Sequence, residues 1–317
     1  MKQFYQKYKY WLKWIFSLTL IICVFYKVDF NALQDGFKLI TWWYYPISIL
    51  FFILLQLIST KRWKLFLPNN KFKELLKLNF IAQYYAFIIP SSITGDVTKA
   101  VQVNKNNNSN SNIISGLIID RWIGFICLIG IVVVALHYCQ VPLFKKFLFP
   151  VLLSFVLLTF SFLLLYTPFY VSFLNLISRW PICSSNKINK ILLFLSDTVS
   201  NMKNYVINYK LLFNVFLYSI IFQLLLAMSY LPLNYIFQFH LSLSDYVLIS
   251  GITQVLVLLP IGIGGVGIKD VSFVSMMGVL GIASEKVIAA TLIGYPIMLL
   301  FVFVGWILSL KVTVYET

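Results

Sequence analysis

Charged residues inside long apolar stretches are the side chains of this chain best placed to do chemistry. They form three acid–base couples, Asp96 with Lys99, Asp120 with Arg121, and Lys269 with Asp270. A charge at the centre of a membrane-spanning helix costs roughly 2.5–3.5 kcal/mol, so such residues usually have a functional role. The alternative is that these couples are internal ion pairs that only fix helix packing, and the sequence leaves it open.

The spacing within each couple predicts how its members are partnered. Asp96 and Lys99 are three residues apart, so they can meet on one helix face. Asp120 and Arg121 are adjacent, as are Lys269 and Asp270, and adjacent side chains point in different directions. We therefore expect these two couples to bridge to other elements.

Arg121 stands out because the chain relies on Lys and has only three Arg residues. Its guanidinium is a planar, permanently charged fork that suits a carboxylate or a phosphate. Its structural role would be to partner a buried Asp, and the alternative, functional role would be to hold an anionic headgroup.

Two interrupted segments carry the same phrase in distant parts of the chain. Residues 88–101 align with residues 258–271 so that an apolar pair, Pro, Ile, Gly, Lys and Val coincide. Both contain helix breakers in apolar surroundings, namely Pro90 and Gly95 in the first and Pro260, Gly264, Gly265 and Gly267 in the second. Such paired breaks point to a binding site in transporters.

The glycines also suit an anion site. They let the backbone turn sharply and approach a ligand, and a new helix is expected to begin near Ile268 with its N–H groups aimed into the break. Close packing of small residues between helices is the alternative explanation for them.

The composition identifies an integral membrane protein. The chain is 60% hydrophobic and only 11% charged, which a soluble domain of 317 residues would not tolerate on its surface. The net charge of +15 comes from Lys residues in short loops, as the positive-inside rule describes, so nucleic-acid binding is not expected. The scattered Cys and the two His residues give no metal-ligand spacing, so no metal and no cofactor are expected.

Hydropathy predicts an all-α, polytopic membrane bundle with about six full spans. The expected spans cover residues 14–26, 40–58, 113–136, 149–169, 211–231 and 287–310. The interrupted stretches 78–101 and 246–280 are expected to form two re-entrant helix hairpins. Residues 184–208 have the apolar spacing of an amphipathic surface helix, although a solvated connector is an equal alternative.

The basic loops set the predicted topology. One cluster, Lys61, Arg62, Lys64, Lys71, Lys73 and Lys77, follows the second span, and others follow the fourth and last spans. Both termini are then cytoplasmic, and the hairpins enter from opposite faces of the inner or plasma membrane. The chain is expected to be one transmembrane domain, 1–317, without a soluble domain. Its halves, about 1–136 and 147–311, would be inverted repeats.

These motifs resemble the lysylphosphatidylglycerol synthase transmembrane region, a flippase-like family of integral membrane proteins. The family carries a P-x-x-x-G-G-D-x-x-R phrase, an acidic–Arg pair in the next span, and a late P-x-x-x-G-G-x-G-x-R-E phrase. Residues 90–99, Asp120 with Arg121, and residues 260–270 correspond to them. Here Thr94 stands for a Gly, Lys99 and Lys269 stand for Arg, and Asp270 stands for Glu.

The resemblance implies a lipid flippase or translocase for an anionic or aminoacylated phospholipid or a lipid-linked headgroup. The expected substrate-binding residues are Pro90, Gly95, Asp96, Lys99, Asp120, Arg121, Pro260, Gly264, Gly265, Gly267, Lys269 and Asp270. The headgroup would enter a positively biased cavity while the lipid tails stay in the bilayer. The chain lacks the soluble aminoacyl-transferase domain, so a transporter is expected rather than an enzyme that makes the lipid.

The alternative function is a membrane enzyme or accessory subunit in polyprenyl-linked sugar or phospholipid metabolism. A third reading is a scaffold with no ligand. The expected partners are a membrane phospholipid or lipid-linked substrate, together with a separate synthase or glycosyltransferase or further copies of the chain.

Overall fold

The structure is a computed structural model, and it describes residues 34, 36, 38–88, 94–104, 110–139, 142–167, 169–170, 172, 186–257 and 267–314. Every regular element in this part of the chain is a helix. The helices of the first part are α3 (Tyr44–Lys64), α4 (Phe72–Ile88), α5 (Thr94–Asn104), α6 (Asn110–Tyr138), α7 (Pro142–Lys145), α8 (Leu148–Leu163) and the short 3₁₀ helix η1 (Leu164–Tyr166). The rest are α10 (Asn186–Ile207), α11 (Tyr209–Met228), α12 (Leu231–Phe237), α13 (Leu243–Val257), α14 (Ile268–Val279) and α15 (Ser284–Val314).

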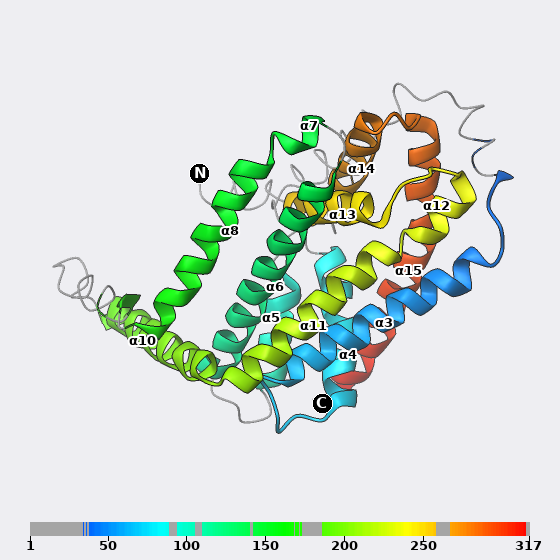
Figure 1. The fold of residues 1–317 in the computed structure, drawn as a ribbon. Helices are drawn as coiled ribbons and strands as arrows, with labels where there is room; N and C mark the ends of the chain where they lie inside the picture. The colour runs from blue at the N-terminus through cyan, green and yellow to red at the C-terminus, as the bar shows by residue number, and fades with distance from the viewer. Residues whose placement is uncertain are drawn as a thin grey trace, which may run out of the picture.

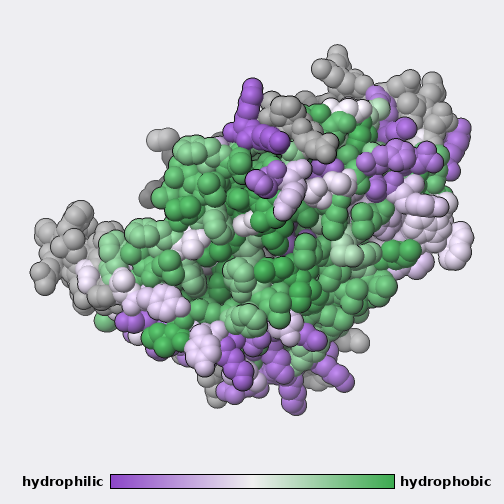
Figure 2. All heavy atoms as spheres, viewed as in Figure 1, coloured by the Kyte–Doolittle hydropathy of each residue, from purple (hydrophilic) through white to green (hydrophobic). Residues whose placement is uncertain are grey.

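Five helical segments are long and apolar enough to cross a membrane. They are Tyr44–Lys64, Ser111–Tyr138, Leu148–Tyr166, Tyr209–Phe237 and Ser284–Leu310. They confirm the five predicted spans that fall on described residues, while the first predicted span, 14–26, lies outside those residues. Figure 2 shows an apolar belt across the middle of this face, with hydrophilic side chains gathered at its two margins. This is the surface expected of a helical bundle that spans a bilayer.

The two interrupted segments each give a pair of helices that pack on each other. α4 contacts α5, and α13 contacts α14. α3 ends and α6 begins at the lower end of Figure 1, so the α4–α5 pair starts and ends there, whereas α13 follows α12 and α14 leads to α15 at the upper end. The turns between the paired helices, 89–93 and 258–266, lie outside the described residues. Re-entry from opposite membrane faces, and the inverted repeats, remain predictions.

Small residues let helices of the bundle pack close together. Gly305 of α15 faces Phe80 of α4 so closely that a Cβ there would collide with the Phe80 carbonyl. A Cβ at Gly251 of α13 would likewise collide with the Val132 side chain of α6. Contacts of this kind let helix backbones approach without a hydrophobic driving force, as is usual in membranes.

Helix α10 confirms the helix predicted near residues 184–208. It packs on α6, where the Ser115 hydroxyl donates to the Thr198 carbonyl at 2.8 Å and the Asn201 amide donates to the Ser111 hydroxyl at 3.1 Å. Met202 and Val206 of α10 are buried in the bundle, whereas Leu193 and Leu195 are exposed. A helix that docks on the bundle and also exposes apolar side chains suits the membrane surface, but that location remains a prediction.

Candidate functional site

A cavity of about 420 Å³ opens between the two helix pairs and the spans beside them. Its lining comes from α3, α5, α6, α11, α13 and α14. Five of the residues predicted from sequence line it, namely Asp96, Lys99, Asp120, Arg121 and Lys269. Residues from the two repeated phrases, 170 positions apart in the cases of Lys99 and Lys269, therefore reach the same space.

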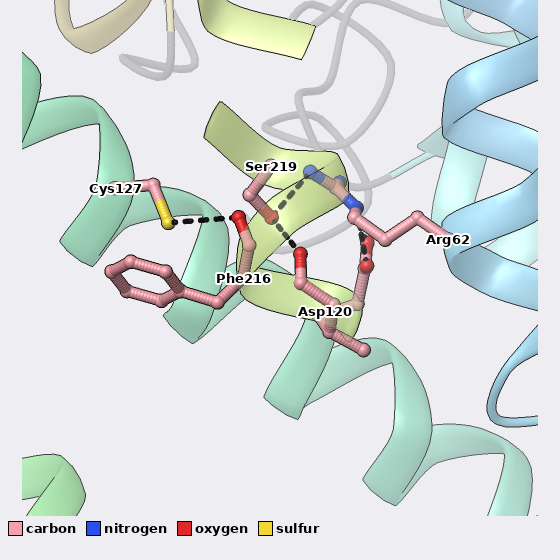
Figure 3. Close-up of polar contacts among 6 residues, drawn as sticks. Arg62, Asp120, Cys127, Phe216 and Ser219 are labelled. Atoms are coloured by element: carbon pink, nitrogen blue, oxygen red, sulfur yellow. Dashed lines mark hydrogen bonds and ion pairs between the residues drawn. The ribbon is translucent and has the colours of Figure 1, made fainter. Parts of the chain in front are cut away.

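The most enclosed ion pair of the cavity joins Arg62 of α3 to Asp120 of α6. Arg62 Nη2 donates to Asp120 Oδ2 at 2.9 Å, and Arg62 Nε lies 2.6 Å from Oδ1. Arg62 Nη1 also donates to the Ser219 hydroxyl of α11 at 3.1 Å, and Figure 3 shows the guanidinium held between these two partners. Each charged side chain is only 14% exposed. The two-point contact with Asp120 holds α3 against α6, and the contact with Ser219 adds α11, so Arg62 fixes three helices relative to one another.

The second ion pair joins Arg121 of α6 to Asp96 of α5. Arg121 Nε donates to Asp96 Oδ2, and the side chains are 37% and 22% exposed. The acidic partner of Arg121 is thus Asp96 of the first repeated phrase, and the acidic neighbour Asp120 is bound to Arg62 instead. The bridging to other elements that the sequence predicted is therefore confirmed for the couple Asp120 and Arg121.

Lys99 and Lys269 are the two cavity cations outside these ion pairs. Lys99 Nζ lies 5.2 Å from the centre of the Trp63 ring, a cation–π distance. Asp96 pairs with Arg121 and forms no ion pair with Lys99, although the three-residue spacing allowed one. Lys269 is exposed to the cavity and makes no ion pair with the residues that the structure describes.

The charged lining therefore has a positive excess. Four cations, Arg62, Lys99, Arg121 and Lys269, face two carboxylates, Asp96 and Asp120, among the described lining residues. Both carboxylates are already engaged by arginines, so the excess resides on Lys99 and Lys269. No group of three His, Cys, Asp or Glu residues in the described ranges could hold a metal ion.

Neutral polar side chains complete the cavity wall. Gln223 of α11 and Gln254 of α13 exchange amide hydrogen bonds, with Gln254 donating at 2.8 Å and Gln223 donating at 3.4 Å. Thr253 beside them is buried, and its hydroxyl has no hydrogen-bond partner among the residues that the structure describes. A buried hydroxyl without a partner is costly unless a ligand or water satisfies it.

Asp270 does not line this cavity, although it directly follows Lys269 in the second repeated phrase. It is 7% exposed, accepts a hydrogen bond from the Tyr295 hydroxyl of α15, and accepts another from the Gly267 backbone N–H at 3.1 Å. Gly267 has a φ of 84°, which a residue with a side chain rarely adopts. Asp270 therefore caps α14 and ties it to α15, and its direct contact with a headgroup is not supported by this geometry.

The remaining predicted site residues divide into two groups. Gly95 packs at the contact of α5 with α4, where an added Cβ would lie 3.5 Å from the Ala82 carbonyl oxygen. Gly267 begins α14 at Ile268, as the sequence predicted. Pro90, Pro260, Gly264 and Gly265 lie outside the described residues.

Arg62 is the functional candidate that the sequence analysis misplaced. Its place among lysines predicts a loop charge, but it lies in the last turn of α3 and its side chain turns into the bundle. One signal was available: an arginine inside a run of lysines, in a chain with only three arginines, indicates a need for the guanidinium fork.

The all-helical bundle with apolar spans and a charged interior cavity defines a multi-pass integral membrane protein. The family model of the lysylphosphatidylglycerol synthase TM region matches residues 10–305, and the chain belongs to that family. Family and fold together place it among integral membrane proteins of lipid metabolism or translocation. No match was found among curated proteins, and none among solved structures.

Proposed function

We propose that the chain is a lipid flippase that moves an anionic or aminoacylated phospholipid, or a lipid-linked headgroup, across the membrane. The observation that carries the proposal is the charged cavity between the helix pairs. Its positive excess lies inside a bundle with an apolar outer belt. An unpaired positive charge inside the membrane costs free energy, and an anionic ligand that enters the cavity would offset that cost.

Lys99 and Lys269 are the proposed contacts for the headgroup phosphate. Each lies nine residues after the proline of its own repeated phrase, and each is on the second helix of its pair. A phosphate between them would meet one cation from each half of the chain. Arg121 stands on the same wall, partly exposed, and its fork can add bidentate contacts while Asp96 orients it.

The helix pairs supply a route for alternating access. The pair α4–α5 is at one end of the bundle and the pair α13–α14 is at the other (Figure 1). If the halves are inverted repeats, movement of one pair against the other would open the cavity to each side in turn. In the predicted topology this happens in the cell membrane with both termini cytoplasmic.

The alternative function, a membrane enzyme, would need a carboxylate for acid–base work. Asp96 and Asp120 are the carboxylates of the cavity, and each is engaged by an arginine. That engagement favours holding the cations in place over exchanging protons with a substrate, so transport is the better supported of the two functions.

Flipping in vesicles tests the proposal. The full chain is reconstituted with a fluorescent anionic phospholipid, and transfer between leaflets is followed by chemical quenching. Arg121→Lys keeps the charge but loses the fork, so we expect a partial loss of rate, whereas Arg121→Ala should lower the rate at least about tenfold. Lys210→Gln is the control, because Lys210 is exposed in the first turn of α11 and does not line the cavity.

A double variant separates a headgroup role from a structural one. Asp96→Asn with Arg121→Gln removes both members of the ion pair, which is often tolerated where removal of one member is not. If Arg121 binds the headgroup, this protein folds but does not flip lipid. Wild-type rates in the double variant would contradict the headgroup role.

A further inference from the structure

A second cavity, of about 390 Å³, adjoins the charged one and has a different chemistry. Helices α3, α4, α11, α12, α13, α14 and α15 contribute to its lining, so it lies among the helices of the bundle. Most of its lining side chains are apolar or aromatic, and Lys269 is the one charged residue among the described lining residues. Both cavities fall within the volume range of small-molecule sites, roughly 300–1,000 Å³.

The two cavities share a wall. Phe222, Leu226, Tyr230 and Lys269 line both of them. Lys269 is thus the point at which the apolar cavity meets the charged one. A molecule that lies across this wall would have a charged end and an apolar end.

Helices α3 and α13 and the segment from α11 to α12 agree on the order of the cavities along the bundle. On α3 the apolar cavity takes residues from Tyr44 to Gln56, and the charged cavity takes Ser59 and Arg62 further along. On α13 the apolar cavity takes Tyr246, and the charged cavity takes Ser250 and the residues after it. The segment from α11 to α12 runs in the opposite direction to α3 (Figure 1). Gln223 lines the charged cavity there, and Ser229 and Leu233, which come later in the chain, line the apolar one.

The residues of α3 that line the apolar cavity span about the length of one acyl chain. Twelve residue steps separate Tyr44 from Gln56 on α3, and at 1.5 Å per residue this is roughly 18 Å. The hydrocarbon core of a bilayer is about 30 Å thick, so the chains of one leaflet extend over about 15 Å. A modest volume spread over that length describes a narrow, elongated space.

We infer that the apolar cavity holds one acyl chain of the phospholipid whose headgroup phosphate binds at Lys269. This inference rests on the proposed function and deepens it, because the protein then recognises the tail as well as the headgroup. It replaces the sequence-based expectation that both tails stay in the bilayer. The headgroup lies toward the lysine-rich end of α3 and the tail toward its beginning. In the predicted topology that is the orientation of a lipid from the cytoplasmic leaflet.

Gly294 gives a direct way to fill the cavity. It lines the apolar cavity on α15, and a Cβ added there would meet no atom within 4 Å. Gly294→Leu therefore extends into the space without a collision at its Cβ. Gly278→Leu is the matched control, because Gly278 is also helical, has the same open surroundings, and lines neither cavity.

The test measures binding of long-chain phosphatidylglycerol and of water-soluble glycerol phosphate to the purified full chain in detergent. Each buried methylene contributes about 0.8 kcal/mol, so displacing a few of them should weaken long-chain binding at least about tenfold in Gly294→Leu. Gly278→Leu should bind like the wild type, and glycerol phosphate should be unaffected by either change. Equal long-chain affinity in the two variants would overturn the inference.

The outcomes separate this inference from the proposed function. Lys269→Gln should weaken both ligands, since it removes a phosphate contact. If Lys269→Gln weakens binding but Gly294→Leu does not, the tail site is wrong and the flippase proposal stands. If neither change alters binding, both are wrong.

A photoreactive group at the end of one acyl chain gives an independent readout. We expect crosslinks to α3 near Tyr44 or to α15 near Val287, which line the far end of the cavity. Crosslinks confined to lipid-facing residues such as Phe149 and Phe160 of α8, which are exposed on the bundle, would overturn the inference. Stronger competition by a polyprenyl phosphate than by phosphatidylglycerol would also overturn the assignment to an acyl chain.

Discussion

The two ion pairs on the cavity wall use the same chemistry but differ in how open they are. Arg62 and Asp120 are each 14% exposed, whereas Arg121 and Asp96 are 37% and 22% exposed. The enclosed pair also holds Ser219, so it joins three helices. The difference teaches that burial separates the two roles a charge can have in a membrane protein, because an enclosed pair fixes the bundle and an open pair remains available to a ligand.

Removing the carboxylate of the enclosed pair is expected to have the largest effect on stability. Asp120→Asn leaves the Arg62 guanidinium in an enclosed place without its counter-charge, which costs about 3–5 kcal/mol in folding free energy. Unfolding in mixed micelles measures the loss. The double variant Asp120→Asn with Arg62→Met should recover most of it, and an equally unstable double variant would show that the pair is not what holds these helices.

Asp270 extends the comparison to a buried carboxylate that has no cation partner in the described part of the chain. Asp270→Ala leaves the Tyr295 hydroxyl and the Gly267 N–H without their acceptor, and each such loss costs about 1–3 kcal/mol. We expect a total near 3 kcal/mol in the same unfolding measurement. Tyr295→Phe, which removes one donor, should cost about 1 kcal/mol, and a larger loss in Tyr295→Phe than in Asp270→Ala would contradict this assignment.

The open pair should give the smallest change in stability. Asp96→Asn removes an ion pair that is partly screened by water in the cavity, so unfolding should change by about 1 kcal/mol or less. Flipping should nevertheless fall severalfold, because Arg121 loses the partner that orients it. A stability loss as large as that of Asp120→Asn would erase the distinction between the two pairs.

The sequence predicted the helical fold well because hydropathy reports spans directly. All five predicted spans on described residues are confirmed, and α14 begins at Ile268 as the glycines indicated. Among the site residues, the rarity of charges in apolar sequence singled out Asp96, Lys99, Asp120, Arg121 and Lys269, and all five line one cavity.

Side-chain partners were harder to predict, because they depend on which helices become neighbours. The sequence places Arg62 among loop lysines, and nothing in it indicates that α3 passes beside Asp120. Asp96 and Asp270 each belong to one of the two phrases, yet Asp96 pairs with Arg121 of α6, whereas Asp270 caps its own helix and accepts a hydrogen bond from Tyr295 of α15. The apolar cavity was not predicted either, since its lining comes from seven helices whose individual residues are ordinary apolar ones.

Headgroup selectivity tests the central claim most directly, namely that Lys99 and Lys269 give the cavity its preference for an anionic lipid. Flipping rates of fluorescent phosphatidylglycerol and phosphatidylcholine are compared in vesicles that contain the wild type or the double variant Lys99→Gln with Lys269→Gln. We expect the wild type to favour phosphatidylglycerol at least about tenfold, and the double variant to lose that preference, since two charge-assisted phosphate contacts are removed. An unchanged preference in the double variant, or a wild type that moves both lipids equally, would contradict the account.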